Sequence, residues 1–383
     1  MIKQEISDGI IKAITLDTNI FDGKQNGFEY GLLKRLQQFR DSETAFVLSD
    51  IVVQEIGAHI RKAASDAQSS IKNSIKEAAN SWILSKETRS NLAQSIWGDD
   101  TPETISKKRL DDFIEKTGAV VVKAMDHVAV DDLVHRYFRC LPPFENKESK
   151  KHEFPDALAL ISIESWATKN ESKVLVVTND GGWKAYCKES PWLVAISDLG
   201  DALGLFQRET AQYTCQLLSE ELRSTDKLCL VRTIEDAIYN QESKFDFDPD
   251  ACSAFNFDWD WPEYALEFVQ IHGIDNDEVL FEPIEIGDDY LVALIKVDIN
   301  VNMSCDYTFS VYDSLDKDYT QIGSVTATTT EEFVADVLVT IKGTMPNCTS
   351  IEEVEVVKQR VNVDFGDIEP DWGDDHDHYD DEV

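Results

Sequence analysis

The first half of the chain alternates short apolar runs with helical patterns, and this alternation constrains the fold more than any other feature of the sequence. The apolar runs are Ile11 to Leu16, Ala45 to Leu48, Val120 to Val122, Lys173 to Val177 and Leu193 to Ile196. Nearly continuous apolar runs of this length are typical of strands that are buried on both faces of a sheet. Because helical patterns separate the runs, we predict an α/β domain with a parallel sheet.

The distribution of charge divides the chain into two parts. Of its 383 residues, those from 241 to 383 include 36 acidic and six basic residues, whereas the first 240 have a net charge of only −7. We predict an α/β domain over residues 1–207, then a helical connector and an acidic, aromatic linker over residues 208–264. Runs with a period of two residues predict a β-rich domain over 265–370. The acidic end, 371–383, is expected to be disordered.

Composition excludes several classes of protein. A net charge of −37 argues against a chain that binds nucleic acid or an anionic membrane over its whole surface, so any basic patch must be local. The seven cysteines form no CxxC pair and fit a reducing compartment. The chain has neither an apolar N-terminal segment nor a run of 18 apolar residues, so we expect a cytoplasmic protein without a membrane span.

Four acidic residues occupy positions that a parallel sheet would bring to one edge. Asp17 and Asp180 directly follow predicted strands, and Glu55 and Asp156 lie in early turns of helices that begin near strand ends. Groups just beyond the carboxyl ends of neighbouring strands face the ligand crevice of such a sheet. We therefore expect these four carboxylates to lie close together.

Clustered carboxylates repel one another unless a cation lies between them. Mg²⁺ and Mn²⁺ prefer oxygen ligands, and such an ion would activate a water molecule for attack on a phosphodiester. The same residues also have plainer interpretations. Asp17 and Asp180 suit strand-exit turns or helix caps, and Asp156 would complement a helix dipole.

The segments around these residues resemble the motifs of the PIN-domain nucleases. The matching segments are LDTNIF around Asp17, a Glu in the helix after the second strand, FPDALAL around Asp156 and VVTNDGGW around Asp180, in that order. The resemblance covers roughly residues 11–197. The long separation between Glu55 and Asp156 leaves helical material over about residues 60–115, which resembles the insertion of larger bacterial members of the superfamily.

The resemblance implies a metal-dependent ribonuclease that usually acts on single strands. It implies that Asp17, Asp156 and Asp180 bind Mg²⁺ or Mn²⁺, and that Glu55 is a further ligand or polarises the attacking water. The supporting polar residues that it implies are Asn19, Thr178 and Asn179. Apart from the resemblance, Lys150 and Lys151 are candidates for contact with a phosphate backbone, or belong to a solvated loop.

Taken together, these features predict a metal-dependent endonuclease that cleaves RNA in preference to DNA. A toxin or an effector of defence is one biological role that fits this activity. The alternative is a non-catalytic scaffold of the same fold that binds RNA or protein. The acidic second half predicts a module that binds a protein partner, such as an antitoxin, or restrains the nuclease. It is equally consistent with a module that only maintains solubility, and a homo-oligomer is left open.

Overall fold

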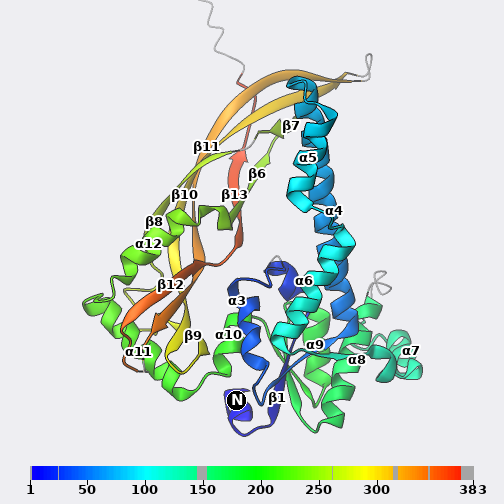
Figure 1. The fold of residues 1–383 in the computed structure, drawn as a ribbon, viewed down its shortest axis with the longest axis vertical. Coiled ribbons are helices and arrows are strands. Elements are labelled where there is room, and N and C mark those ends of the chain that lie inside the picture. Colours follow the sequence, from blue (N-terminus) through cyan, green and yellow to red (C-terminus); the bar gives the residue numbers. More distant parts are fainter. Residues whose placement is uncertain are drawn as a thin grey trace, which may run out of the picture. The chain divides into compact units, whose positions relative to one another are not determined.

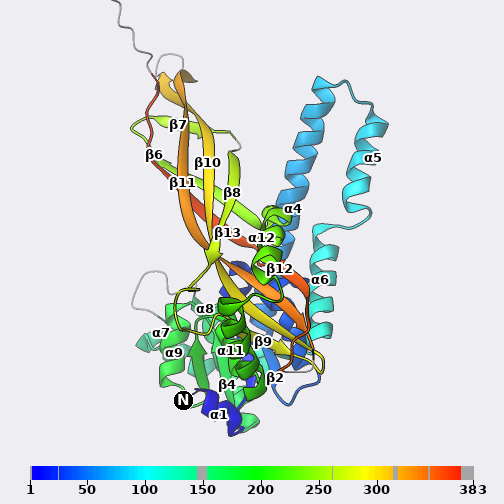
Figure 2. The same ribbon diagram turned by 90° about the vertical axis from the view of Figure 1, so that its left-hand side faces the viewer.

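The structure is a computed structural model that describes residues 2–24, 26–144, 153–260, 262–313, 318–343 and 346–371. The chain divides into two compact units (Figures 1 and 2). Unit 1 comprises Met1–Glu209 and Pro283–Gly287, and unit 2 comprises Thr210–Glu282 and Asp288–Val383. Among the helices within the described ranges, none combines the length and the apolar character that a bilayer-spanning segment needs.

Unit 1 is built on a five-stranded sheet with the order β3-β2-β1-β4-β5, in which all neighbouring strands are parallel. The strands are β1 (Ile11–Leu16), β2 (Ala45–Ser49), β3 (Val120–Val122), β4 (Lys173–Val177) and β5 (Leu193–Ile196). The central strands are largely buried because most of their side chains are apolar: Val174 to Val177 of β4 are fully inaccessible. The predicted α/β fold with a parallel sheet is confirmed.

Helices flank this sheet. They are α1 (Ile2–Ser7), α2 (Thr18–Gly23), α3 (Gly31–Lys34), α4 (Asp50–Ser81), α5 (Lys86–Trp97), α6 (Pro102–Thr117), α7 (Val130–Arg139), α8 (Phe154–Lys169), α9 (Gly181–Glu189) and α10 (Leu199–Leu205). Helix α4 begins where the pattern predicts, because the Ser49 side chain accepts a hydrogen bond from the backbone N–H of Ile51 at 3.3 Å. Pro155 lies in the first turn of α8, as expected.

The range 60–115 consists of most of α4, all of α5 and most of α6, which extend away from the sheet (Figures 1 and 2). Gly57 lets α6 approach α4 closely: a Cβ atom there would lie 3.4 Å from the Leu110 side chain, and the Ser106 hydroxyl donates to the Gly57 carbonyl at 2.7 Å. The pattern correctly places the interruption, between Trp97 and Pro102. This helical material begins in the same helix that carries Glu55.

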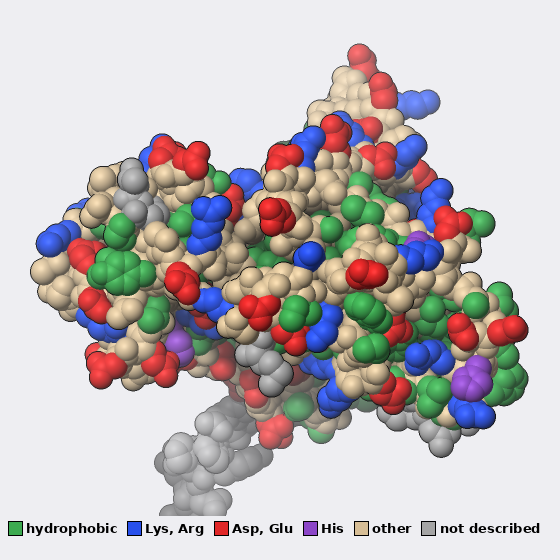
Figure 3. All heavy atoms as spheres, turned by 90° about the horizontal axis from the view of Figure 1, so that it is seen from below, with side chains coloured by type: hydrophobic (Ala, Val, Ile, Leu, Met, Phe, Trp, Pro, Cys, Tyr) green, Lys and Arg blue, Asp and Glu red, His purple; other side chains and the backbone are tan. Residues whose placement is uncertain are grey.

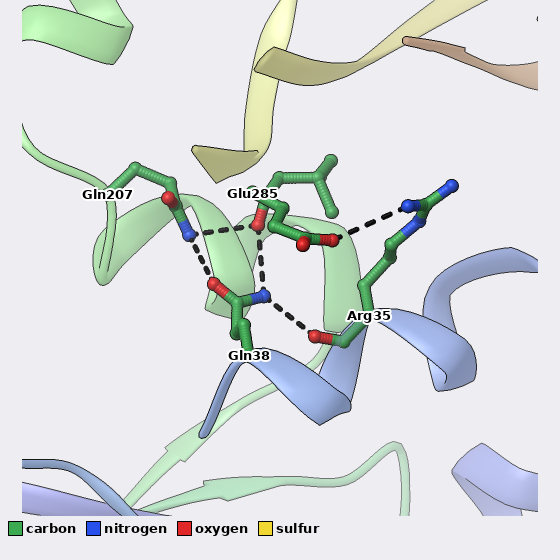
Figure 4. A network of polar contacts seen from close by, with 5 residues as sticks. Arg35, Gln38, Gln207 and Glu285 are labelled. Carbon is green, nitrogen blue, oxygen red and sulfur yellow. Dashed lines mark hydrogen bonds and ion pairs between the residues drawn. The ribbon is translucent and has the colours of Figure 1, made fainter. Parts of the chain in front are cut away.

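A segment from late in the chain belongs to unit 1 (Figure 4). The carbonyl of Ile284 accepts hydrogen bonds from Gln207 Nε2 at 2.8 Å and from Gln38 Nε2 at 3.1 Å. Gln207 Nε2 also donates to Gln38 Oε1 at 2.9 Å, and Arg35 forms an ion pair with Glu285 at 3.4 Å. Side-chain amides therefore hold Pro283–Gly287 against residues that are far away in the sequence.

Unit 2 is rich in antiparallel strands, which confirms the predicted β-rich C-terminal region. It contains α11 (Glu209–Ser224), α12 (Leu230–Asn240), β6 (Phe245–Cys252), β7 (Asn256–Trp259), β8 (Glu263–Ile271), β10 (Tyr290–Asp313), β11 (Asp318–Lys342), β12 (Ser350–Val356) and β13 (Gln359–Asp367), with β9 (Glu282–Ile286) between β8 and β10. Strands β10 and β11 pair along their whole length, from Tyr290 opposite Lys342 to Asp313 opposite Asp318. Figures 1 and 2 show them as long curved strands that run side by side.

The acidic and aromatic segment 245–264, which we expected to be a linker, instead contains β6, β7 and the start of β8. Its alternation of Phe with Asp has the period of a strand. Phe245 packs edge-on against Phe333 with ring centroids 5.2 Å apart, whereas Asp248 forms an ion pair with Arg360 at 2.7 Å. Strand β6 pairs in parallel with β13, more than one hundred residues later. Apart from Asp371, the predicted disordered tail lies outside the described residues.

Candidate active site

Asp17 lies where strands β1 and β4 end side by side. Its backbone N–H donates to the carbonyl of Val177 at 3.0 Å, and only 4% of the residue is exposed. The carboxylate oxygen Oδ2 accepts hydrogen bonds from the Thr178 hydroxyl and from the Asn19 amide, both at 2.6 Å. Although Asp17 precedes α2 at the N-cap position, its side chain is thus held by contacts across the sheet.

Glu55 lies in the second turn of α4 and is half-buried. The Thr18 hydroxyl donates to Glu55 Oε2 at 2.7 Å, so the residue directly after Asp17 orients the carboxylate of another helix. Sequence analysis did not assign a role to Thr18. The available signal was its place in the first turn of a helix that starts at the strand end.

Asp156 lies in the first turn of α8 and is held by Trp183 of α9. The indole Nε1–H of Trp183 donates to Asp156 Oδ1 at 2.8 Å, and the backbone N–H of Trp183 donates to Asp180 Oδ1 at 2.8 Å. Trp183 is 2% exposed. One buried residue, which sequence analysis quoted but gave no role, therefore orients two of the four carboxylates.

Asp180 is the N-cap residue of α9, so the cap that the Asn-Asp-Gly-Gly turn suggests is present. Its backbone N–H donates to the Thr178 hydroxyl at 3.0 Å. Gly182 is required by close approach: a Cβ atom there would lie 3.0 Å from the Pro143 carbonyl and 3.1 Å from Asp180 Oδ1. The capping hydrogen bond is accepted by Oδ1 of Asp180. A metal ligand needs only one carboxylate oxygen, so the cap is compatible with metal binding through Oδ2.

Asp17 and Asp156 lie close enough to the other carboxylates for those charges to raise their pKa. The pKa of Asp17 is raised to about 7: burial is the largest cause, the Thr178 hydrogen bond lowers the pKa, and the neighbouring charges of Asp156 and Asp180 raise it. Burial likewise raises the pKa of Asp156 to about 6, with further contributions from Glu55 and Asp180. The fold therefore concentrates negative charge at the end of the sheet that the sequence indicates.

The donor chemistry of this cluster consists of carboxylate and hydroxyl oxygens, which suits Mg²⁺ or Mn²⁺. Within the described ranges, no group of three or more His, Cys, Asp and Glu side chains is arranged to hold a metal ion directly. Mg²⁺ commonly keeps several waters and uses only one or two protein carboxylates. The residues therefore fit an ion with few direct carboxylate ligands and with water at its other positions.

The remaining predicted site residues have different outcomes. The Asn19 side chain bonds Asp17 and accepts, through Oδ1, a hydrogen bond from the backbone N–H of Asn179 at 3.5 Å. Asn19 thus lies between the two strand ends. Lys150 and Lys151, the candidates for substrate contact, lie outside the described residues.

Comparison with known proteins agrees with this geometry. A family model described as a PIN domain matches residues 14–183, a range that begins in β1, ends in α9 and contains all four carboxylates. No curated protein and no solved structure matches the chain. PIN domains are generally metal-dependent nucleases. Residues 14–183 of this chain therefore form a PIN domain.

Proposed function

We propose that unit 1 is a metal-dependent endoribonuclease whose active site is the cluster of Asp17, Glu55, Asp156 and Asp180. The observation that carries the proposal is the convergence of these side chains beyond the ends of β1 and β4, where Thr178 contacts both Asp17 and Asp180 and nearby carboxylates raise the pKa of Asp17 and Asp156. Keeping such a cluster is unfavourable without a cation, because burial and like charges both oppose ionisation. Perturbed carboxylates that share one site are typical of functional centres.

Each carboxylate has a proposed role. Asp17, Asp156 and Asp180 would hold Mg²⁺ or Mn²⁺ directly or through water. When bound, the ion would stabilise the negative charge that builds on the phosphoryl oxygens during hydrolysis. Glu55 would orient the attacking water and accept its proton. The Thr18 hydroxyl fixes the carboxylate through Oε2, which leaves Oε1 as the oxygen that would contact the water.

RNA is the proposed substrate, ahead of DNA. The support is the resemblance of the four motifs to a family that usually cleaves single-stranded RNA. A cytoplasmic location, a role as a toxin or defence effector, and a protein partner for the acidic module stay predictions.

The test is cleavage of labelled single-stranded RNA, tRNA and single-stranded DNA with Mg²⁺ or Mn²⁺, by the full chain and by Asp17→Asn. Asp66→Asn, which makes the same change at an exposed position on α4, is the matched control. Loss of a metal ligand should reduce cleavage by at least about 100-fold, because even residues that only orient ligands contribute about 10–100-fold. EDTA should abolish the activity of wild type and control alike.

Two results would contradict the proposal in different ways. Full metal-dependent cleavage by Asp17→Asn would refute the assignment of the site. A wild-type chain that binds RNA but cleaves no substrate with either metal would favour the alternative, a non-catalytic scaffold of the same fold.

A further inference from the structure

A cavity of about 550 Å³ lies along one edge of the sheet of unit 1. It runs along β5, which forms one edge of the five-stranded sheet, and along the adjacent helix α9. We call it the α9–β5 groove. It is lined by Ile2, Glu5, Lys173, Lys184, Cys187, Lys188, Ser190, Leu193, Val194, Ala195 and Ser197.

The groove begins one helical turn from the candidate active site. The backbone N–H of Lys184 donates to the carbonyl of Asp180 at 3.1 Å, and Lys188 follows one turn later. Residues four apart lie on the same face of a helix, about 5–6 Å from one another. Lys184 and Lys188 therefore lie on one face of α9, in a row that starts one turn after the N-cap residue Asp180 and runs along the groove.

The lining of the groove is positively charged, in contrast to the chain as a whole. It contains three lysines and one acidic residue, whereas the whole chain has a net charge of −37. Lys173 contacts both carboxylate oxygens of Glu5 at 3.0 Å, so this pair is neutral. In the part of the chain that the structure describes, Lys184 and Lys188 have no ion-pair partner. The groove therefore has two cations available to an anionic ligand.

On the face drawn in Figure 3, Lys and Arg side chains are interspersed among Asp and Glu side chains. The floor of the groove is apolar, since it includes the buried residues Cys187 and Leu193, which are 6% and 2% exposed. A groove with cations along one wall and an apolar floor suits a single nucleic-acid strand, whose backbone is charged and whose bases are not.

We propose that the α9–β5 groove binds the substrate strand as it leaves the active site, with Lys184 and Lys188 contacting phosphates of its backbone. The inference rests on the proposed function, because it assigns the substrate path of the same site. Lys184 and Lys188 are a pair that the fold places on one helix face, starting one turn from Asp180, and phosphate contact by Lys150 and Lys151 stays a prediction from the sequence.

The test compares the full-length wild type with Lys184→Glu/Lys188→Glu. The matched control is Lys107→Glu/Lys108→Glu, which makes the same charge change at exposed positions on α6. Affinity for labelled single-stranded RNA is measured in EDTA over a series of salt concentrations. Loss of two phosphate contacts should reduce the slope of log K against log salt by about 1.4, because each contact to a single strand contributes about 0.7.

Cleavage gives a second readout. The double variant should show a raised KM for a long oligoribonucleotide, and the increase in KM should be smaller for a dinucleotide, which cannot reach Lys188. A second double variant, Lys184→Gln/Lys188→Gln, should reproduce the smaller salt slope without introducing negative charge. If the Glu variant does not fold, the salt slope and KM of the Gln variant still test the proposal.

The outcomes separate the two proposals. If wild type binds and cleaves RNA but the Gln variant keeps the wild-type slope and KM, the groove is not the substrate path and the nuclease assignment stands. If the α6 control loses as much slope as the groove variants, binding is diffuse and the inference fails. If wild type neither binds nor cleaves RNA, the proposed function fails and the groove assignment fails with it.

Discussion

The Thr178 hydroxyl lies 2.6 Å from Asp17 Oδ2 and joins the ends of two neighbouring parallel strands. Both residues are buried, and the same hydroxyl accepts a hydrogen bond from the backbone N–H of Asp180 at 3.0 Å. A single side chain thus connects two of the proposed metal ligands. The orientation of the carboxylate after β1 therefore depends on the residue that follows β4.

Replacing Thr178 with Val should weaken metal binding by about 10–100-fold, because residues that orient metal ligands contribute on that scale. The loss of the hydrogen bond would also raise the pKa of Asp17 further, which disfavours the ionised form that binds a cation. Calorimetric titration with Mn²⁺ measures the affinity. Thr178→Ser keeps the hydroxyl and should bind nearly as well as wild type. Equal affinity of the Val and Ser variants would contradict the role of the hydroxyl.

The stability of the metal-free protein should fall as pH rises from about 4 to about 7. Burial raises the pKa of Asp17 from 3.8 in the unfolded chain to about 7 in the folded state, so the folded protein binds this proton more tightly. The stabilisation is fully present below pH 3.8 and is lost as pH passes through about 7. It amounts to at most about 4 kcal/mol, because each pKa unit corresponds to about 1.4 kcal/mol.

Asp17→Asn isolates this effect, because Asn resembles the protonated carboxyl group at every pH. The variant should match wild type near pH 4 and become more stable than wild type near pH 7, as measured by urea unfolding in EDTA. Added Mn²⁺ should reduce the difference. A constant difference across this range would show that Asp17 ionises in the folded state much as it does in the unfolded chain.

Trp183→Phe should shift the acidic limb of the pH–rate profile to higher pH. The indole hydrogen bond lowers the pKa of Asp156, so its loss raises a pKa that is already about 6 and delays ionisation of the proposed ligand. The smaller ring also leaves a cavity and lowers stability, but a purely structural defect would not move the profile. Trp166→Phe, on the same helix as Asp156, controls for the substitution and should leave the profile in place.

Gln207→Leu should destabilise unit 1 by about 1–3 kcal/mol, the usual cost of leaving a buried polar group without its partner. Gln207 is 6% exposed, and its amide donates to both the Ile284 carbonyl and Gln38 Oε1. Urea unfolding measures the loss. Gln94→Leu, at an exposed position on α5, should change stability little. Equal stabilities of the two variants would mean that this network does not stabilise the fold.

Local pattern was enough to predict much of unit 1. The runs at β1, β3, β4 and β5 match the strands residue for residue, because short runs rich in Val, Ile and Leu favour strands both in the centre of a sheet, as at β4, and at its edge, as at β3. Asp17 and Asp180 also follow from local information, since each directly succeeds such a run. The rule that parallel strands end at one edge of the sheet then predicts that they meet.

Local pattern failed where pairing joins distant segments. The sequence from Phe245 to Cys252 looks like a linker because its Asp residues are unfavourable in an isolated strand. The structure places it beside β13, where Arg360 neutralises Asp248. The assignment of Pro283–Gly287 to unit 1 likewise depends on Gln207, which no periodicity relates to Ile284.

The sequence by itself therefore determined the strands of unit 1, their parallel arrangement and the identities of four carboxylates at the edge of that sheet. Only the tertiary structure decided how those carboxylates are held and how strongly they are perturbed. The pKa of Asp17 depends on burial and on charges from α8 and α9, and the orientation of Asp156 depends on an indole 27 residues away. Burial and hydrogen bonding at such separations are properties of packed elements, whereas periodicity reports only what neighbouring residues share.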